Sequence, residues 1–207
     1  MQNTVWDRIE AARSRWNVLE HPFYQRWSAG ELSADELADY SGQYRHAVEA
    51  IADLSAYTAR ELPEEAELKD HAREEAEHVA LWDGFVEAVN GRPDAEPTAE
   101  TAECVEVSTR ADGAVSALAR LYAIESGQPE ISRTKLEGLA AHAQYGVDEG
   151  PGTQYFSVHR GRDLEHAAEG RELLAARLGA DRESADLAVE AAEQAFEANW
   201  NLLDGVS

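Results

Sequence analysis

Three side chains of the kinds that bind divalent metals share one predicted helical stripe in the last third of the chain. His159, Asp163 and His166 follow one another at spacings of four and three residues. At 100° per residue, Asp163 lies about 40° to one side of His159, and His166 about 20° to the other. Imidazole and carboxylate groups that face one way over two helical turns suit a metal site in a helical bundle. The alternative interpretation is a solvated face of an acidic helix.

Two more segments supply ligands of the same types on other predicted helices. Glu75 and His78 are three residues apart, and Glu74 and His78 are four apart, so either carboxylate can share a metal with His78. Glu125 follows the apolar stretch 118–124, where a buried carboxylate needs a cation or a metal partner. The pieces together give three histidines and three carboxylates, a ligand set expected for two metal ions with open positions.

The two lysines of the chain stand out against its arginines. Of 18 basic residues, only Lys69 and Lys135 are lysine. Lys69 lies in a charged stretch and is interpreted as a surface residue. Lys135 is predicted on the helix after that of Glu125, from which it can approach the metals. A lysine kept where arginine is otherwise preferred raises the question of whether its amine is chemically needed.

Composition excludes several classes of function. The chain has 207 residues, 41 acidic and 18 basic, and a formal net charge of −23. This charge argues against binding of nucleic acids and of anionic membrane surfaces. No apolar run is long enough to span a membrane and no signal peptide is evident, so a cytoplasmic protein is expected. Cys104 is the only cysteine, which excludes an intramolecular disulfide and a cysteine-based zinc site.

The segments that carry these residues show the periodicity of helices, and no part of the chain sustains the alternation typical of a strand. We therefore predict an all-α fold, a bundle of seven to eight helices forming a single domain over residues 1–207. Ser33 and Glu36 form a capping-box pattern at the start of a long helix. Pro63 and Pro129 are each expected to start a new helix. The predicted helices cover about 4–19, 34–60, 63–90, 99–109, 113–127, 130–144, 153–179 and 182–203, with a short additional segment that ends at Gly30.

Four stretches carry a resemblance to a known family. They are residues 21–27 (HPFYQRW), 39–44 (DYSGQY), 122–130 (YAIESGQPE) and 155–166, to which Thr134-Lys135 can be added. The chain resembles the haem-oxygenase-like dimetal oxidases, which share their fold with the oxidase of pyrroloquinoline quinone synthesis and with thiaminase II. Within that superfamily it resembles the relatives of the chlamydial protein associating with death domains. The likeness extends from about residue 5 to residue 204.

The resemblance implies two metal ions, iron as Fe(II)/Fe(III) with a second iron or manganese, together with O2 and an external reductant. By resemblance alone, it is also compatible with a homodimer. In the family pattern a longer insert separates the first glutamate from its histidine, so Glu74 and Glu75 compete for that role. We prefer Glu75, because it forms the Glu-x-x-His pair. The implied metal ligands are Glu75, His78, Glu125, His159, Asp163 and His166.

The resemblance further implies a self-sacrificing 4-aminobenzoate synthase, a folate-precursor enzyme that consumes its own side chains. Tyr24 matches the tyrosine that supplies the ring, Tyr40 a second essential tyrosine, and Lys135 the amine donor. Ordinary half-buried aromatic residues and a solvated lysine are the alternatives at these positions.

Three other functions compete with this prediction. A multi-turnover dimetal oxidase would cleave a carbon–carbon bond or oxidise nitrogen in an external fatty-acid or amino-acid substrate. Thiaminase chemistry needs a cysteine nucleophile, and no matching motif surrounds Cys104. A non-enzymatic module would bind basic partners through its acidic surface. His71, seven residues before His78, shares its helix face, but three histidines already suffice for the predicted ligand set.

Overall fold

The described part of the chain is entirely helical. The computed structural model describes residues 4–178 and 182–206. These residues form eight α-helices and two short 3-10 turns, and contain no strand, as the all-α prediction requires. The helices are α1 Val5–Arg15, α2 Pro22–Ala29, α3 Ala34–Glu61, α4 Ala66–Ala88, α5 Ala99–Ser108, α6 Ala114–Ala141, α7 Pro151–Arg177 and α8 Arg182–Asp204, and the turns are η1 Val18–Glu20 and η2 Ala143–Tyr145.

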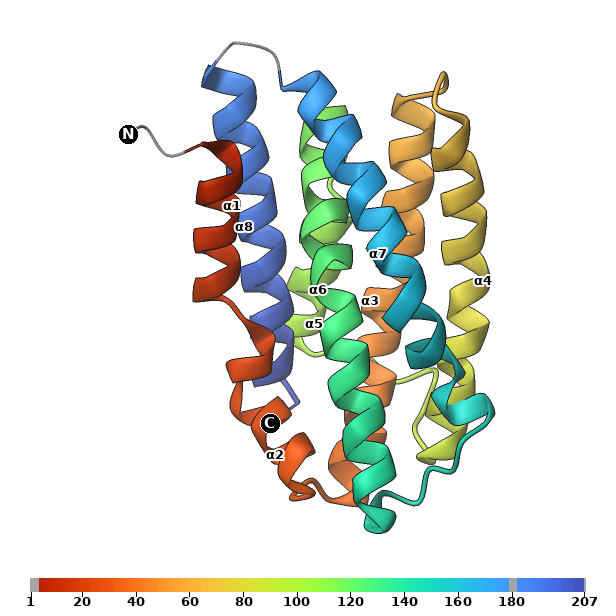
Figure 1. Cartoon of the computed structure of the whole chain (residues 1–207). Helices are drawn as coiled ribbons and strands as arrows, with labels where there is room; N and C mark the ends of the chain where they lie inside the picture. Colours follow the sequence, from red (N-terminus) through yellow and green to blue (C-terminus); the bar gives the residue numbers. More distant parts are fainter. Residues whose placement is uncertain (1–3, 179–181, 207) are drawn as a thin grey trace.

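The long helices run side by side along one axis (Figure 1). Helix α6 packs against α7 and α8, while α4 packs against α3 and α7. Helix α1 lies against α8, and α5 bridges α8 and α3. Helices α4, α6 and α7, which carry the predicted metal ligands, are therefore brought together by direct packing. Over the described residues, none of the helices combines the length and the apolar character needed to cross a membrane.

The long helix α3 begins where the sequence predicts. The Ser33 hydroxyl accepts a hydrogen bond from the Glu36 backbone N–H at 3.2 Å, and the Glu36 carboxylate accepts one from the Ser33 N–H at 2.8 Å. This reciprocal cap satisfies two backbone donors that a helix start otherwise leaves free. Helix α3 carries Tyr40 and Tyr44 into the core from this fixed starting point.

Three predicted boundaries are wrong. Pro129 starts no new helix, because α6 continues through it from Ala114 to Ala141. Proline breaks one helical hydrogen bond, at a cost of about 3 kcal/mol, but residues on both sides of it are buried and hold the helix together. Pro63 precedes α4 by a turn, and α4 begins at Ala66. Helix α1 ends at Arg15, after which η1 changes the direction of the chain.

One half of the core is strongly aromatic. Trp27, Trp82, Phe85 and Phe156 are fully buried there and meet mostly in tilted or edge-to-face contacts. Such geometry is favourable for aromatic pairs beyond the area that they bury. The other half is built from alanine and aliphatic side chains, mainly of α6 and α8. Aromatic residues thus surround Lys135, while small residues let α6 and α8 approach closely.

Candidate metal centre and tyrosine–lysine site

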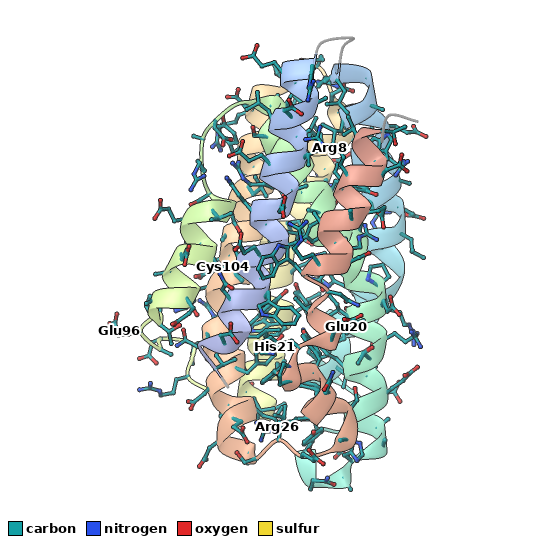
Figure 2. The ribbon with its side chains drawn as sticks, turned by 90° about the vertical axis from the view of Figure 1, so that its left-hand side faces the viewer. Arg8, Glu20, His21, Arg26, Glu96 and Cys104 are labelled. Carbon is teal, nitrogen blue, oxygen red and sulfur yellow. The ribbon has the colours of Figure 1, made fainter. Side chains whose placement is uncertain are left out.

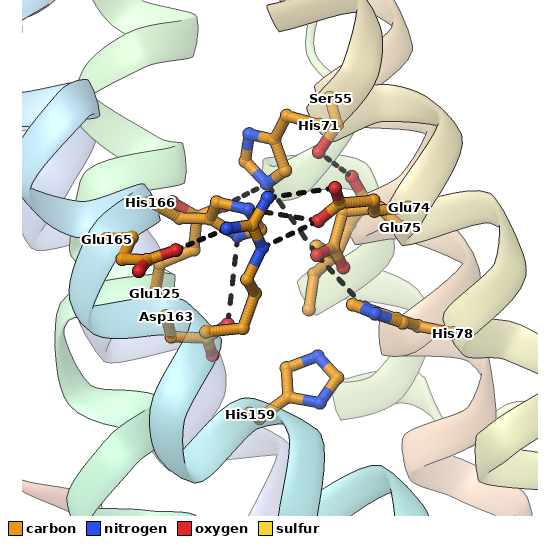
Figure 3. A network of polar contacts seen from close by, with 12 residues as sticks. Ser55, His71, Glu74, Glu75, His78, Glu125, His159, Asp163, Glu165 and His166 are labelled. Carbon is orange, nitrogen blue, oxygen red and sulfur yellow. Dashed lines mark hydrogen bonds and ion pairs between the residues drawn. The ribbon is translucent and has the colours of Figure 1, made fainter. Parts of the chain in front are cut away.

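Seven buried residues with metal-binding side chains converge between three helices (Figure 3). Each residue is at most 6% exposed. The three of these residues that belong to helix α4 are spaced by four and three positions, so their side chains lie on one face of the helix. The residues are His71, Glu75 and His78 from α4, Glu125 from α6, and His159, Asp163 and His166 from α7.

The ligand atoms form two groups that share one carboxylate. In the first group, atoms of His71, Glu75, Glu125 and His166 all lie within 4.8 Å of one another. The second consists of Glu75, His78 and His159, within the same limit. Because Glu75 belongs to both groups, the two groups of ligand atoms are adjacent.

The polar atoms of this cluster face one another without making well-aligned hydrogen bonds. His71 Nε2 lies 2.8 Å from Glu125 Oε1, yet both atoms lack hydrogen-bond geometry. Both oxygens of Asp163, both ring nitrogens of His166 and Nε2 of His159 are likewise buried without a hydrogen-bond partner. Buried polar atoms rarely remain unsatisfied. Metal ligands are lone-pair atoms that converge on a common centre, so these buried nitrogens and oxygens fit a metal site.

A hydrogen bond to the backbone prepares His159 for metal binding. Its Nδ1 lies 2.8 Å from the Tyr155 carbonyl oxygen, to which it donates. With the proton on Nδ1, the lone pair of Nε2 is free for a metal, and the ring orientation is fixed. Desolvation lowers the pKa of His159 to about 4, which keeps the imidazole in its neutral, metal-binding form.

Burial and the neighbouring charges shift the protonation of the cluster residues. Burial raises the pKa of Glu125, and it raises that of Asp163 to about 9. Desolvation opposes protonation of His71, but the Glu125 and Glu75 carboxylates outweigh it and raise the His71 pKa to about 10. A divalent cation would stabilise the ionised carboxylates that burial alone disfavours. The electrostatics therefore also fit a metal.

The two competing glutamates have different surroundings. Glu74 is 29% exposed and receives two hydrogen bonds from Arg162, at 2.8 and 2.9 Å. Glu75 is buried, and its Oε1 lies 3.1 Å from His78 Nδ1. The structure thus places Glu75 inside the cluster, and it pairs Glu74 with Arg162 at the rim (Figure 3).

Two residues differ from the predicted arrangement. Asp163 lines a cavity of about 10 Å³ together with Glu75, Glu125 and His159, but it belongs to neither group of close ligand atoms. His71, which the predicted ligand set omits, is a member of the first group. Its spacing of four and seven residues from Glu75 and His78 was the available signal.

Lys135 lies apart from the cluster, inside a cage of aromatic rings. Contrary to the prediction, it is on the same helix as Glu125, ten residues and about 15 Å farther along α6. It is fully buried, and its Nζ has no hydrogen-bond partner. Nζ lies 5.7 Å from the centre of the Tyr24 ring, 5.2 Å from Tyr40 and 4.7 Å from Tyr44, with Trp82 and Phe156 at 5.2 and 5.0 Å. Desolvation lowers the Lys135 pKa to about 7.

The two predicted tyrosines contact each other beside this amine. The hydroxyl oxygens of Tyr24 and Tyr40 are 3.3 Å apart, within hydrogen-bond distance. Both residues are buried, and desolvation raises both pKa values well above the ordinary range. Both phenols are therefore protonated at neutral pH. The structure brings Tyr24, Tyr40 and Lys135 together, although they come from three different helices.

Cys104 has none of the features of a nucleophile. It lies on α5 (Figure 2), is 1% exposed, and desolvation raises the pKa of its thiol to about 12. The thiolate needed for nucleophilic chemistry is disfavoured there.

Comparison with known proteins gives the cluster a context. No protein-family model matches the chain. A protein of Chlamydia trachomatis named 4-aminobenzoate synthase is 28% identical over 96% of this chain and 90% of its own length. A protein of Nitrosomonas europaea with the same name is 27% identical over 99% of this chain and 91% of its own length. The chain is a homologue of proteins named 4-aminobenzoate synthase. The resemblance predicted from its sequence is thereby confirmed.

Solved structures establish the fold. A TenA homologue from Pseudomonas syringae has a TM-score of 0.79 at 18% identity, and the match covers 98% of this chain and 90% of that protein. A domain with a haem-oxygenase-like fold from Shewanella denitrificans has a TM-score of 0.77 at 19% identity, covering 100% and 93%. The predicted haem-oxygenase-like bundle is therefore confirmed.

Proposed function

We propose that the protein is an oxygen-dependent, self-sacrificing 4-aminobenzoate synthase. Tyr24 would supply the aromatic ring and Lys135 the nitrogen, with Tyr40 assisting. The observation that carries the proposal is the unpartnered Lys135 amine, buried beside the hydrogen-bonded Tyr24 and Tyr40. The homologues named 4-aminobenzoate synthase support the same assignment.

The cage prepares the Lys135 amine to act as a nitrogen donor. A buried ammonium without a carboxylate partner is costly, so the neutral amine is favoured. With a pKa of about 7, a substantial fraction of Lys135 is neutral at physiological pH and has a free lone pair. The surrounding rings exclude water, which would otherwise compete for the reacting carbon.

The bond changes follow from the structure of 4-aminobenzoate, which has one carbon outside the ring. The Cα–Cβ bond of Tyr24 breaks, Cα takes up a hydrogen, and Cβ is oxidised to the carboxylate carbon with oxygen from O2 or water. Lys135 Nζ forms a bond to the ring carbon that carries the phenolic oxygen, and that oxygen leaves as water. Oxidation of Lys135 Cε to an aldehyde then breaks the Cε–Nζ bond and releases the product. O2 is the oxidant and is reduced to water, and an external reductant supplies the electrons that the chain does not.

The seven-residue cluster is the proposed site of two metal ions. Glu75, His78, Glu125, His159, Asp163 and His166 would hold them, and His71 is placed to join the set. When bound, an Fe pair or an Fe/Mn pair would supply the redox chemistry that activates O2. The Tyr24 and Tyr40 hydroxyl oxygens are 3.3 Å apart, so a proton can pass between them as the ring is oxidised.

The decisive experiment follows labelled atoms from the chain into the product. Protein made with ε-15N-lysine and ring-13C-tyrosine is loaded anaerobically with Fe(II), with and without Mn(II), and then exposed to O2 and a reductant. We expect at most one 4-aminobenzoate per chain, carrying both labels, and mass changes that map to Tyr24 and Lys135. Metal binding and O2 uptake with an unmodified chain would overturn the proposal.

The controls use the few lysines of the chain. Lys135→Arg should abolish the labelled product. Lys69→Arg should leave the amount of product unchanged, because Lys69 is exposed and its amine donates a hydrogen bond to the Pro63 carbonyl, away from the site. The amounts of labelled product formed by Tyr24→Phe and by Tyr40→Phe are also compared. If turnover instead requires an added fatty acid or amino acid, the multi-turnover oxidase takes the place of this proposal.

A further inference from the structure

A second cavity, of about 100 Å³, lies next to Tyr24 and Tyr44 on the side away from the cluster residues. It is bounded by α1, η1, α2, α3, α6 and α8, close to the turn where Glu20 is labelled in Figure 2. Its outer wall includes Arg13 and Asn17, which are partly exposed, and its inner wall the buried Tyr24 and Tyr44. The cavity thus connects the tyrosine–lysine site with the outer layer of the bundle.

Three residues of the cavity wall carry buried polar atoms without hydrogen-bond partners. Two are donors, Arg13 Nε from the last turn of α1 and Trp16 Nε1 from the residue that caps its C-terminus. The third is an acceptor, Gln128 Oε1, from a side chain that is 4% exposed. The amide of Gln128 is held in place because its Nε2 donates to the Tyr44 hydroxyl at 3.0 Å. Unpaired buried groups are costly, and a ligand that pairs all three would recover that free energy.

The remaining contacts of Arg13 leave room for an anion. Its Nη2 donates to Ser126 Oγ and lies 3.4 Å from Glu10 Oε1, whereas Nε is free. The other charged residue of the wall, Glu130, pairs with Arg133. An arginine N–H and an indole N–H are donors that suit a carboxylate.

The rest of the wall is mostly apolar. Ala123, Ile124, Ile131 and Phe196 line the cavity together with Tyr24. A mostly apolar wall with a few polar groups favours a flat aromatic ligand that carries polar substituents. The donors of Arg13 and Trp16 suit a carboxylate, and the acceptor of Gln128 suits an amine.

We propose that this cavity binds the 4-aminobenzoate product, with its carboxylate on Arg13 and Trp16 and its amine on Gln128. The assignment rests on the proposed function for the identity of the ligand. It adds a release site between the place where the ring is excised and the solvent. Gln128 and Ile124 also line the small cavity of the metal cluster, so they separate the product site from the proposed metals.

Binding is tested on the metal-free protein under anaerobic conditions, so that no turnover is needed. 4-Aminobenzoate, benzoate and aniline are titrated by calorimetry. We expect saturable binding of 4-aminobenzoate with one site per chain, and at least tenfold weaker binding of benzoate and of aniline. Each of these lacks one of the two polar ends.

Matched variants of α1 identify the site. Arg13→Gln should weaken 4-aminobenzoate binding at least tenfold. Arg15→Gln has the same change in charge but lies outside the cavity wall, and should change binding less than twofold. Trp16→Phe keeps most of the ring and removes the N–H, so a severalfold loss is expected. Trp6→Phe is its control, because Trp6 packs on Tyr122 elsewhere on α1.

The outcomes separate this inference from the function on which it rests. Absence of saturable binding, equal affinity for benzoate, or equal effects of Arg13→Gln and Arg15→Gln would each overturn it. If Arg13→Gln fails to fold, the Trp16→Phe and Trp6→Phe pair decides. Labelled product from a protein that does not bind added 4-aminobenzoate would refute the cavity assignment alone. Binding without self-processing would refute only the proposed function.

Discussion

The ring of His159 stacks on the ring of Tyr155, with centres 3.9 Å apart and planes inclined by 24°. Tyr155 in turn meets Trp82 edge-on at 4.9 Å, and Trp82 is a wall of the cage around Lys135. One tyrosine thus contacts both the metal-binding cluster and the aromatic cage. The two parts of the candidate site are joined by packing and not merely by proximity in the fold.

Replacing Tyr155 by leucine should weaken metal binding without removing a ligand. The stacked ring limits the orientations of His159, and its loss leaves only the backbone hydrogen bond to direct Nε2. We expect the affinity for Fe(II) to fall about tenfold in Tyr155→Leu, measured by anaerobic titration. Tyr155→Phe retains the stack and should bind as the wild type does. Equal losses in both variants would show that the hydroxyl, and not the stacking, matters.

The adjacent glutamates should respond differently to neutralisation. Glu75→Gln alters the carboxylate common to both groups of ligand atoms, so the affinity for both ions should fall at least about tenfold. Glu74→Gln breaks an ion pair with Arg162 at the rim, which is worth about 1 kcal/mol or less. The number of metal ions that remain bound per chain after gel filtration distinguishes the two variants. A loss of both ions in Glu74→Gln but not in Glu75→Gln would contradict the assignment.

His71 should affect one ion more than the other. It belongs to the group with Glu125 and His166, and it is absent from the group formed by Glu75, His78 and His159. His71→Gln is therefore expected to reduce binding from two ions per chain to about one. His142→Gln serves as the control, because the His142 ring bonds the Ser28 carbonyl at the surface. Two ions retained at wild-type affinity in His71→Gln would remove this residue from the ligand set.

Sequence patterns predicted the features that depend on residues close together in the chain. The Ser33 cap and the stripe formed by His159, Asp163 and His166 depend on spacing along one helix, and the structure contains both. Spacing also placed Glu75 within reach of His78. Their roles in metal binding and catalysis remain proposals.

Other features depend on packing between helices and were not accessible from spacing. Pro129 is a strong local signal for a helix start, but burial on both sides of it outweighs the lost hydrogen bond. The different surroundings of Glu74 and Glu75 depend on Arg162, which bonds Glu74 from 88 residues away in sequence. The inclusion of His71 likewise depends on Glu125 and His166, from two other helices.

The buried amine of Lys135 should reduce the stability of the fold. Its pKa is about 7 in the folded protein and near 10.5 in the unfolded chain, so between these values the unfolded chain binds more protons. Stability therefore rises with pH across this window and is lowest below about pH 7. Lys135→Met should be more stable than the wild type by on the order of 3 kcal/mol at pH 7, and the difference should shrink towards pH 10. Urea unfolding at several pH values measures it, and a difference independent of pH would contradict the buried amine.

Formation of 4-aminobenzoate should depend on pH through the same group. The proposed chemistry needs the lone pair of neutral Lys135, whose pKa is about 7. The rate of product formation should therefore increase about tenfold per pH unit below 7 and level off above it. Metal binding also responds to pH, so occupancy is measured in every sample and the rate is expressed per metal-loaded chain. A profile that is flat between pH 6 and pH 8 at constant occupancy would mean that deprotonation of Lys135 does not limit the reaction.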